Sequence, residues 1–262
     1  MPQSTPTTLP RFPDLDGKTA VVTGGSKGIG AVTCEALAAN GVRVAVIARD
    51  SERIDEVVGR LKRARRESIG ISADCTNSDE LAAARREVEA QIGSVDILVV
   101  FAGGFSRTTS ILELQQTEWD DVIASNLTAT FLTVKEFLPG MVERGSGAII
   151  TMASNAGRLL DIPLNASYAA AKAGIVMFTR HLALEVGRHG VRANCVAPAT
   201  TLTERVQVLM SDARRAEVAA LAPLGTLGAP EDTAYAVLYL CSDAAKWITG
   251  ITMDISGGRI ML

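Results

Sequence analysis

The sequence predicts an α/β protein whose doubly wound, mostly parallel sheet of seven strands carries helices on both faces. From Lys18 onward, short β-rich apolar runs alternate with longer segments of helical periodicity. The short runs are apolar throughout rather than at every second residue, as in parallel strands buried on both faces, and each intervening segment is long enough for a helical crossover. The expected strands are residues 19–23, 43–48, 68–72, 96–102, 148–153, 192–197 and 251–255.

The segment from Ser51 to Arg66 is the clearest amphipathic helix. Its apolar residues recur at helical spacing, and its basic residues gather at the C-terminal end, where they complement the helix dipole. We interpret the basic run as a solvated face rather than as a binding patch. The apolar stripe is Ile54, Val57, Val58 and Leu61, and the basic run is Lys62, Arg63, Arg65 and Arg66.

Two later segments, residues 116–142 and 166–188, are expected to be long helices. Both are rich in small or apolar residues on more than one face. Helices of this kind usually bury a second face against a neighbouring subunit. We therefore expect a homo-oligomer.

The composition is that of a globular protein and excludes several partners. Hydrophobic residues make up 47% of the 262 residues, charged residues 21%, and the net charge is −3, without the basic excess that nucleic-acid binding requires. The first sixteen residues hold four prolines and three threonines and no apolar run that fits a signal peptide or membrane helix. We expect a flexible tail over residues 1–16 and a single domain over residues 17–262.

The four cysteines lie far apart and lack metal-ligand spacing, so they are expected to be reduced core thiols of a cytoplasmic protein. No His, Cys or acidic cluster predicts a metal site, and both histidines are treated as structural or surface residues. The cysteines are Cys34, Cys75, Cys195 and Cys241, and the histidines are His181 and His189.

The first expected strand runs into a glycine-rich loop, TGGSKGIG over residues 23–30, and then into a helix that should end before Gly41. Gly24, Gly28 and Gly30 allow a tight turn, close approach of the backbone to a pyrophosphate, and tight packing of helix on strand. The helix N-terminus adds N–H donors and positive potential. The order strand, glycine loop, helix predicts a nucleotide site.

The end of the second strand bears on the choice of nucleotide. Folds that prefer NAD usually offer an acidic side chain there to the ribose hydroxyl. Here Ala48 stands at that place and Arg49 follows it, while Lys27 lies in the glycine loop, so two cations could flank a 2′-phosphate. We expect NADPH to be preferred over NADH. A one-residue shift would let Asp50 take the ribose hydroxyl instead.

Tyr168 and Lys172 are separated by alanines only, in the stretch YAAAK. Residues four apart lie on one face of a helix, so the phenol and the ammonium can reach the same point. Taken alone, the pair is equally compatible with a half-buried tyrosine beside a lysine that extends to solvent.

Several motifs together resemble the short-chain dehydrogenases/reductases, and most closely the 3-oxoacyl-acyl-carrier-protein reductase-like branch. The resemblance covers nearly all of the chain from Gly17 to Gly258 and implies a single-domain Rossmann fold, an oxidoreductase with a nicotinamide cofactor, and a homotetramer. The motifs are TGGSKGIG, the AG of VFAGG, SNL at 125–127, MASNAG, YAAAK, VRANCVAP and the closing segment from Pro230 to Gly258.

The resemblance implies catalytic roles for four residues. Tyr168 is the general acid or base, and Lys172 lowers the pKa of its phenol, ordinarily about 10, and holds the nicotinamide ribose. Ser154 hydrogen-bonds the substrate oxygen; its alternative is a helix or turn cap. Asn126 belongs to a proton relay to Lys172; its alternative is an amide that bends the helix.

The same resemblance implies the residues that hold the cofactor. Asp74 faces the adenine, although it could instead cap the following helix. Thr203 contacts the carboxamide or phosphates, and Ala102 and Gly103 line the floor of the site. The expected set is Gly24, Ser26, Lys27, Gly28, Ile29, Gly30, Arg49, Asp74, Ala102, Gly103, Tyr168, Lys172, Pro198, Thr201 and Thr203.

The chain departs from the family pattern at three places. Phe101 stands where asparagine is usual, Ala199 stands where glycine is usual, and one extra residue separates Ser154 from Tyr168. The extra residue falls in a segment that should border the substrate, which puts the substrate's identity in doubt. An apolar pocket with a mobile lid follows if the apolar residues there face inward; the alternative is lid packing or subunit contact. These residues are Leu159, Leu160, Ile162, Leu164, Val206, Leu209 and Met210.

The leading hypothesis is an NADPH-dependent reductase of a ketone or 3-oxoacyl-type carbonyl, acting on a small molecule without nucleic-acid or membrane partners. The alternatives are an NAD-dependent alcohol or sugar dehydrogenase and a nucleotide-binding sensor or scaffold without chemistry. A carrier-protein substrate would require basic residues near the pocket mouth. The candidates for that role are Arg107, Arg144, Arg158 and Arg188.

Overall fold

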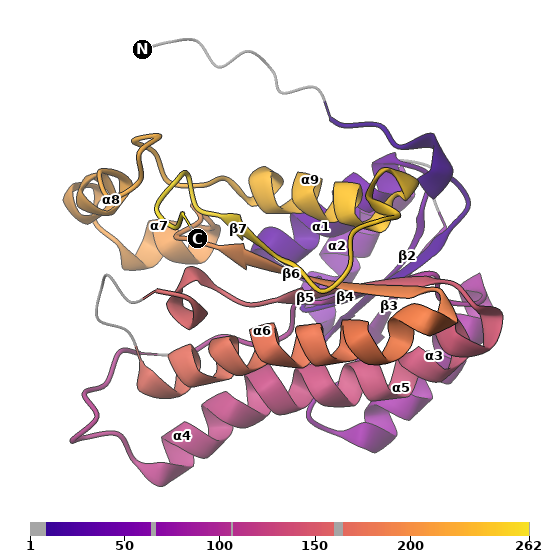
Figure 1. Cartoon of the computed structure of the whole chain (residues 1–262), viewed down its shortest axis with the longest axis horizontal. Helices are drawn as coiled ribbons and strands as arrows, with labels where there is room; N and C mark the ends of the chain where they lie inside the picture. Colours follow the sequence, from indigo (N-terminus) through magenta and orange to yellow (C-terminus); the bar gives the residue numbers. More distant parts are fainter. Residues whose placement is uncertain (1–8, 64–66, 106, 160–164, 262) are drawn as a thin grey trace.

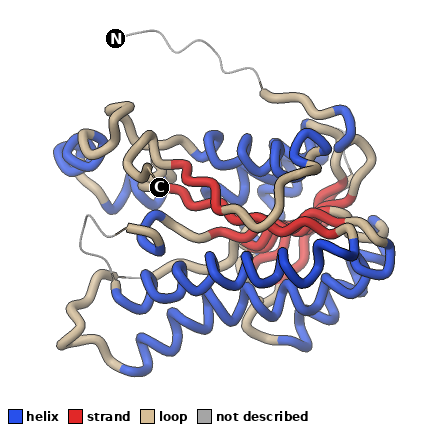
Figure 2. Tube along the Cα trace, viewed as in Figure 1, coloured by secondary structure: helices blue, strands red, loops and turns tan. Residues whose placement is uncertain are grey.

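The computed structural model describes residues 9–63, 67–105, 107–159 and 165–261. Its centre is a seven-stranded sheet in the order β3-β2-β1-β4-β5-β6-β7 (Figures 1 and 2). Every neighbouring pair is parallel, so the predicted sheet is confirmed and is more uniform than the expected mostly parallel one. The strands are β1 (Thr19–Thr23), β2 (Arg43–Ala48), β3 (Ser68–Ser72), β4 (Ile97–Val100), β5 (Gly147–Met152), β6 (Val191–Pro198) and β7 (Thr252–Ile255).

Helices cover both faces of the sheet, as predicted (Figure 1). One face carries α1 (Gly28–Ala39), α2 (Ser51–Arg63) and α9 (Pro230–Cys241). The other carries α3 (Ser78–Ile92), α4 (Gln116–Ile123), α5 (Ala129–Arg144) and α6 (Ala166–Val186). Two apolar cores result, one on each side of the sheet, and the four cysteines lie buried with free thiols.

The apolar stripe predicted for α2 is buried against β2 and β3. Of its predicted basic run, Arg65 and Arg66 lie outside the described residues. α1 ends as expected before Gly41, whose φ of 91° places it in the left-handed region.

The segment predicted as one long helix over residues 116–142 is helical to Arg144 and is interrupted. A π-helical turn, η2 (Ala124–Thr128), joins α4 to α5 and holds the buried Asn126. A π-helical turn shifts backbone groups out of the hydrogen-bond pairing of an α-helix, and such turns often lie at functional sites.

The N-terminal segment differs from the expected tail. Residues 1–8 lie outside the described part, but the chain from Leu9 packs on the first core, and a short 3-10 helix, η1 (Pro13–Leu15), buries Leu15 completely. The Asn40 side chain accepts a hydrogen bond from Phe12 N and donates one to Pro10 O. Pro13 stands at the first position of this short helix, so it begins a packed turn in this part of the segment.

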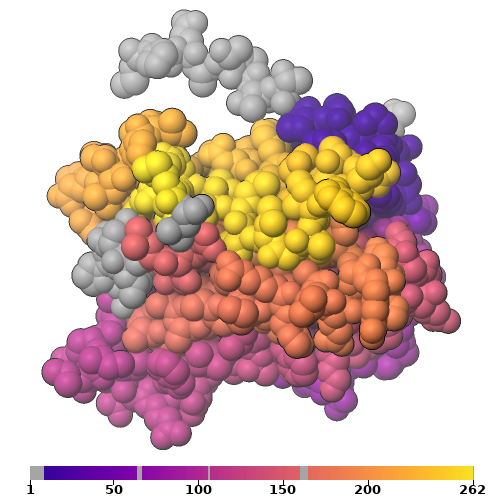
Figure 3. Space-filling view, viewed as in Figure 1, coloured from indigo at the N-terminus to yellow at the C-terminus, as the bar shows by residue number. Residues whose placement is uncertain are grey.

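Two short helices stand apart from the layers. α7 (Glu204–Leu209) and α8 (Asp212–Ala219) follow β6 and form a lid beside the C-terminal chain (Figures 1 and 3). The lid is closed at its base by a parallel bridge between Thr201 and Gly228, with Leu202 N donating to Gly228 O at 2.7 Å. It lies beyond the carboxyl ends of the strands, the edge at which such sheets bind ligands.

Candidate active site

The glycine loop has the geometry that its sequence predicted. Gly24 has a φ of 67°, and a Cβ there would lie 2.7 Å from Phe101 O. A Cβ at Gly30 would lie 2.2 Å from Gly24 O, so the first turn of α1 rests directly on the loop backbone. α1 begins at Gly28, and its N-terminal N–H groups therefore lie at the strand ends, where a pyrophosphate could accept their hydrogen bonds.

Arg49 follows β2 and is exposed, with Nη1 3.9 Å from Asp74 Oδ2. The Asp74 carboxylate accepts hydrogen bonds from Thr76 N (2.9 Å) and Thr76 Oγ1 (2.7 Å), and these hydrogen bonds hold its pKa below the usual range. The helix that follows is capped by Asn77 and not by Asp74, so the capping alternative is wrong. Asp74 therefore remains beside Arg49.

Asp50 was the alternative partner of the ribose hydroxyl. Its carboxylate accepts from Arg53 N at 3.2 Å and forms an ion pair with the Arg53 guanidinium at 3.2 Å, at the start of α2. Capping of this kind satisfies a backbone donor in the first turn. Asp50 is therefore engaged at the N-terminus of α2. Lys27, the residue before α1, is exposed in the glycine loop.

Tyr168 and Lys172 lie on one face of α6, with Lys172 Nζ 5.5 Å from the centroid of the Tyr168 ring. Lys172 is only 4% exposed and donates to Met152 O at 2.9 Å, so it does not extend to solvent. Burial lowers its pKa to about 8. The ammonium is thus held against the carboxyl end of β5, beneath the phenol.

Burial raises the pKa of Tyr168, since the phenolate loses its hydration. A hydrogen bond from Ser154 and the charge of Arg205 on α7 act in the opposite direction and lower it. The resemblance assigned this electrostatic role to Lys172, and the sequence analysis did not single out Arg205. No local pattern marks this arginine, which reaches the tyrosine from another element.

Ser154 follows β5, and its position is compatible both with a turn cap and with a hydroxyl that hydrogen-bonds the substrate oxygen. Its hydroxyl accepts from Ala156 N at 3.2 Å, which caps a short 3-10 helix, η3 (Asn155–Gly157), and donates to Asn155 Oδ1 at 3.2 Å. The same hydroxyl faces Tyr168 and lowers the pKa of its phenol. The cap fixes the serine where it can serve the phenol and a substrate oxygen together.

Asn126 is fully buried in the π-helical turn. Its Oδ1 accepts from Gly104 N at 2.9 Å, and its Nδ2 donates to Gly104 O and to Val122 O, each at 2.8 Å. A Cβ at Gly103 would lie 2.5 Å from Asn126 Oδ1. The amide therefore holds the backbone that leaves β4, which gives it a structural role beside the predicted proton relay.

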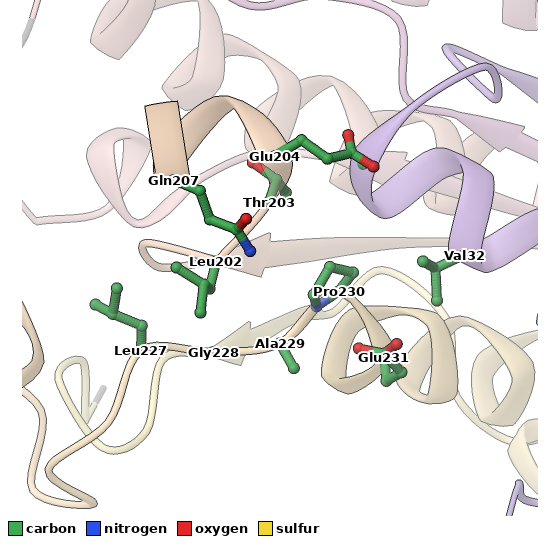
Figure 4. Close-up of a pocket in the computed structure, with 11 residues that line it drawn as sticks. Val32, Leu202, Thr203, Glu204, Gln207, Leu227, Gly228, Ala229, Pro230 and Glu231 are labelled. Atoms are coloured by element: carbon green, nitrogen blue, oxygen red, sulfur yellow. The ribbon is translucent and has the colours of Figure 1, made fainter. Parts of the chain in front are cut away.

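The other expected cofactor residues lie along the same edge of the sheet. Thr203 caps α7 and approaches the glycine loop, since a Cβ at Gly28 would lie 3.3 Å from its Cγ2. Behind that contact is a cavity of about 370 Å³ between the start of α1, α7 and the start of α9 (Figure 4). Pro198 ends β6, Ser26 and Thr201 are buried, Ile29 is half-buried, and Ala102 and Gly103 follow β4.

The expected apolar lining is met only in part. Leu159 and Leu209 are exposed (47% and 66%), whereas Val206 and Met210 are half-buried. Leu160, Ile162 and Leu164 lie outside the described residues.

All four basic residues considered for carrier-protein contact have partners within the chain: Arg107 pairs with Glu118, and Arg188 donates from Nε to His189 Nε2. Arg158 forms a largely buried ion pair with Asp254 on β7, Nε to Oδ1 2.9 Å and Nη2 to Oδ2 3.0 Å. Arg144 donates to Val95 O at 2.5 Å, at the opposite end of β4.

Among the described residues no group of His, Cys, Asp or Glu could hold a metal, and no helix could span a membrane.

The comparisons with known proteins agree with this geometry. The family described as short chain dehydrogenase matches residues 18–214. The 3-oxoacyl-[acyl-carrier-protein] reductase FabG of Staphylococcus aureus (strain Mu50 / ATCC 700699) is 37% identical over 245 residues, covering 93% of this chain and 98% of that protein. FabG of Escherichia coli (strain K12) is 35% identical over 252 residues, covering 95% and 100%.

Solved structures show the same likeness. A 3-oxoacyl-[acyl-carrier protein] reductase from Brucella melitensis ATCC 23457 superimposes with a TM-score of 0.93 at 29% identity, covering 100% of this chain and 98% of that one. A variant of actinorhodin polyketide ketoreductase with NADPH gives 0.87 at 31% identity, covering 92% and 97%. The chain belongs to the short-chain dehydrogenase/reductase family of NAD(P)-dependent oxidoreductases.

Proposed function

We propose that this enzyme reduces a ketone or 3-oxoacyl-type carbonyl to an alcohol with NADPH, through one catalytic unit formed by residues 17–262. The observation that carries the proposal is the convergence of Tyr168, Ser154 and the buried Lys172 at the carboxyl end of β5. The names of its relatives, which include 3-oxoacyl reductases and a polyketide ketoreductase crystallised with NADPH, support the substrate class and the cofactor.

The residues present fit the cofactor. The glycine loop and the start of α1 would hold the pyrophosphate, Arg49 and Lys27 the 2′-phosphate, and Lys172 the nicotinamide ribose. When bound, NADPH supplies the hydride to the carbonyl carbon. Tyr168 donates its phenolic proton to the carbonyl oxygen, while the Ser154 hydroxyl turns its one proton from Asn155 Oδ1 to the same oxygen and orients it.

Lys172 keeps the proton transfer electrostatically favourable. With a pKa of about 8 it carries its charge at neutral pH, and that charge lies beneath the ring that becomes a phenolate. Asn126 holds the chain that borders this site and, in the proposed relay, would hold a water that passes a proton toward Lys172.

We also propose a cytoplasmic homotetramer in which α5 and α6 meet a second copy. The supporting observation is a set of exposed apolar side chains on these helices: Phe131 (45% exposed), Met177 (60%) and Leu184 (84%). Apolar patches of this kind commonly mark subunit contacts. Sedimentation of the wild type against Leu184→Glu tests it, because a charge at the contact should yield smaller species.

The function is tested by oxidation of NADPH and NADH with an acetoacetyl thioester, an aryl ketone and a cyclic ketone. We expect faster turnover with NADPH and loss of at least about a hundredfold in kcat for Tyr168→Phe, which cannot donate the proton. Tyr235→Phe on α9, on the opposite face of the sheet, is the matched control. A preference for NADH with alcohols would favour the dehydrogenase alternative, and binding without turnover would favour the sensor.

A further inference from the structure

The segment that leaves β4 crosses the catalytic tyrosine. The half-buried Phe105 places its ring centroid 4.6 Å from that of Tyr168, with the planes tilted by 48°. Aromatic pairs at this separation and tilt attract one another beyond simple apolar contact. The position of the phenol is therefore coupled to the position of Phe105.

This segment is held from two sides. On one side Asn165, which is fully buried, donates from Nδ2 to Arg107 O at 3.4 Å. Asn165 also caps α6, accepting from Ser167 N at 3.0 Å and from Tyr168 N at 3.4 Å. One side chain thus joins the segment after β4 to the turn that carries the tyrosine.

On the other side Arg205 reaches across from the lid. Its Nη2 donates to Phe105 O at 2.5 Å, which links residues a hundred positions apart in the sequence. Arg205 lies on α7 two residues after Thr203, whose Cγ2 would lie 3.3 Å from a Cβ added at Gly28 of the glycine loop. The lid therefore lies close to the glycine loop and is hydrogen-bonded to the segment that packs on Tyr168.

Among the described residues, few charges face the phenol from the elements around it. Lys172 faces it from its own helix and is tied to Met152 O, and the uncharged Ser154 hydroxyl faces it from the end of β5. Arg107, on the same segment as Phe105, is paired with Glu118 at 3.1 Å. Arg205 is the cation whose charge lowers the pKa of Tyr168.

We propose that Arg205 is a positioning residue for proton transfer by Tyr168. By donating to the Phe105 carbonyl it fixes the Phe105 ring against the phenol and holds its own guanidinium near the same group. This hydrogen bond joins α7 to the segment after β4, so the position of the lid bears on the position of the proton donor. The inference rests on the proposed reductase function and adds a residue to that site.

The first test titrates the phenol without turnover. Phenolate absorbance is followed against pH, and the spectrum of the same protein carrying Tyr168→Phe is subtracted, which removes the signal of the two other tyrosines. Removing a nearby positive charge disfavours the phenolate. We expect Arg205→Gln to raise the Tyr168 midpoint by about half a pH unit or more, and Arg205→Lys to raise it as well, because a lysine, with an ordinary pKa of about 10.4, loses its charge in the same pH range.

The matched control is Arg214→Gln on α8, whose guanidinium pairs with Glu217 at 2.8 Å and is likewise exposed. It should leave the midpoint and the kinetics of the wild type unchanged. A midpoint in Arg205→Gln that equals that of Arg214→Gln would overturn the proposal. Because this readout needs no substrate, it judges Arg205 even if the wild type turns over no ketone, an outcome that would refute only the proposed function.

The second test separates the guanidinium from the ring. Phe105→Leu keeps the carbonyl that Arg205 binds and removes the aromatic contact. Because the ring fixes the phenol, we expect a severalfold lower kcat for Phe105→Leu with an unchanged phenolate midpoint, and a fall of about tenfold in kcat for Arg205→Gln. An unchanged kcat in either variant would overturn the positioning role.

Discussion

The cofactor side and the lid side of this molecule are built in different ways. Around the glycine loop, backbone lies on backbone: a single added carbon at Gly30 would sit 2.2 Å from Gly24 O. Among the described residues of α7 and α8, by contrast, only Val218 is buried, and the lid is held by a short bridge and by side-chain contacts such as that of Arg205. Backbone packing fixes the structure of the cofactor side, whereas a few exposed side chains fix the position of the lid.

The largest effect should come from filling the contact inside the glycine loop. Gly30→Ala places a methyl group against the Gly24 carbonyl, which cannot move without displacing the turn that receives the cofactor. We expect cofactor affinity to fall by at least about a hundredfold, with a lower melting temperature. Cofactor fluorescence on binding and thermal denaturation measure both.

Gly59→Ala is the matched control for that substitution. Gly59 lies inside α2 with nothing within 4 Å of an added Cβ. Alanine is the better helix former by up to about 1 kcal/mol, so this variant should be slightly more stable and should bind cofactor normally. Equal behaviour of the two variants would refute the claim that backbone contact shapes the cofactor site.

The next effect concerns the ion pair between Arg158 and Asp254, whose side chains are 11% and 15% exposed. Asp254→Asn would leave the guanidinium largely buried without its counter-charge, so we expect the free energy of unfolding to fall by about 3 kcal/mol. Urea denaturation measures the loss. Asp50→Asn is the control, because its ion pair with Arg53 is exposed and asparagine caps a helix as well as aspartate does.

Equal losses in these two variants would mean that the buried pair contributes no more than a surface one. A larger loss in Asp254→Asn would show that the segment after Ser154 is fastened to β7 by this pair. The firmly packed cofactor side of the molecule would then extend as far as Arg158, where the substrate side begins.

A smaller effect is expected for the choice of cofactor. Arg49→Asp removes the cation proposed to bind the 2′-phosphate and places a second carboxylate beside Asp74. We expect the ratio of kcat/KM with NADPH to that with NADH to fall by about tenfold or more. Arg53→Asp, one helical turn away on α2, should leave that ratio unchanged; a ratio indifferent to Arg49 would favour the NAD-dependent alternative.

The smallest effect on stability should come from the lid. Val208→Ser and Leu209→Ser alter side chains that are 84% and 66% exposed, so each should change the free energy of unfolding by less than about 0.5 kcal/mol. If these residues serve the pocket mouth, KM for an apolar ketone should rise severalfold while kcat is retained. A large stability loss would contradict the description of α7 as a helix resting on its base.

The same contrast explains what the sequence could predict. The strands, the glycine loop and the alignment of Tyr168 with Lys172 follow from local periodicity and spacing, and the structure has them at the expected residues. Buried strands and glycine turns are specified by adjacent residues, which is why a single sequence reveals them. Local pattern alone did not reveal that Asn126 lies in a π-helical turn.

The rest depended on contacts between distant segments. Leu15 fills the core next to α1, although its neighbours have the composition of a loose tail. Asn77, not Asp74, caps α3, and Arg205 meets Phe105 across the site. Pairings of this kind depend on where the backbone has already placed each residue, so residue type and spacing could not predict them.

The central claim is that this site transfers hydride to a carbonyl carbon while Tyr168 supplies the proton. The most direct measurement uses NADPH carrying deuterium at the transferable position of the nicotinamide, with mass analysis of the alcohol formed from the best ketone of the panel. We expect deuterium on the carbinol carbon with the wild type and almost none with Tyr168→Phe. Labelled cofactor that binds tightly while every ketone remains unlabelled would contradict it.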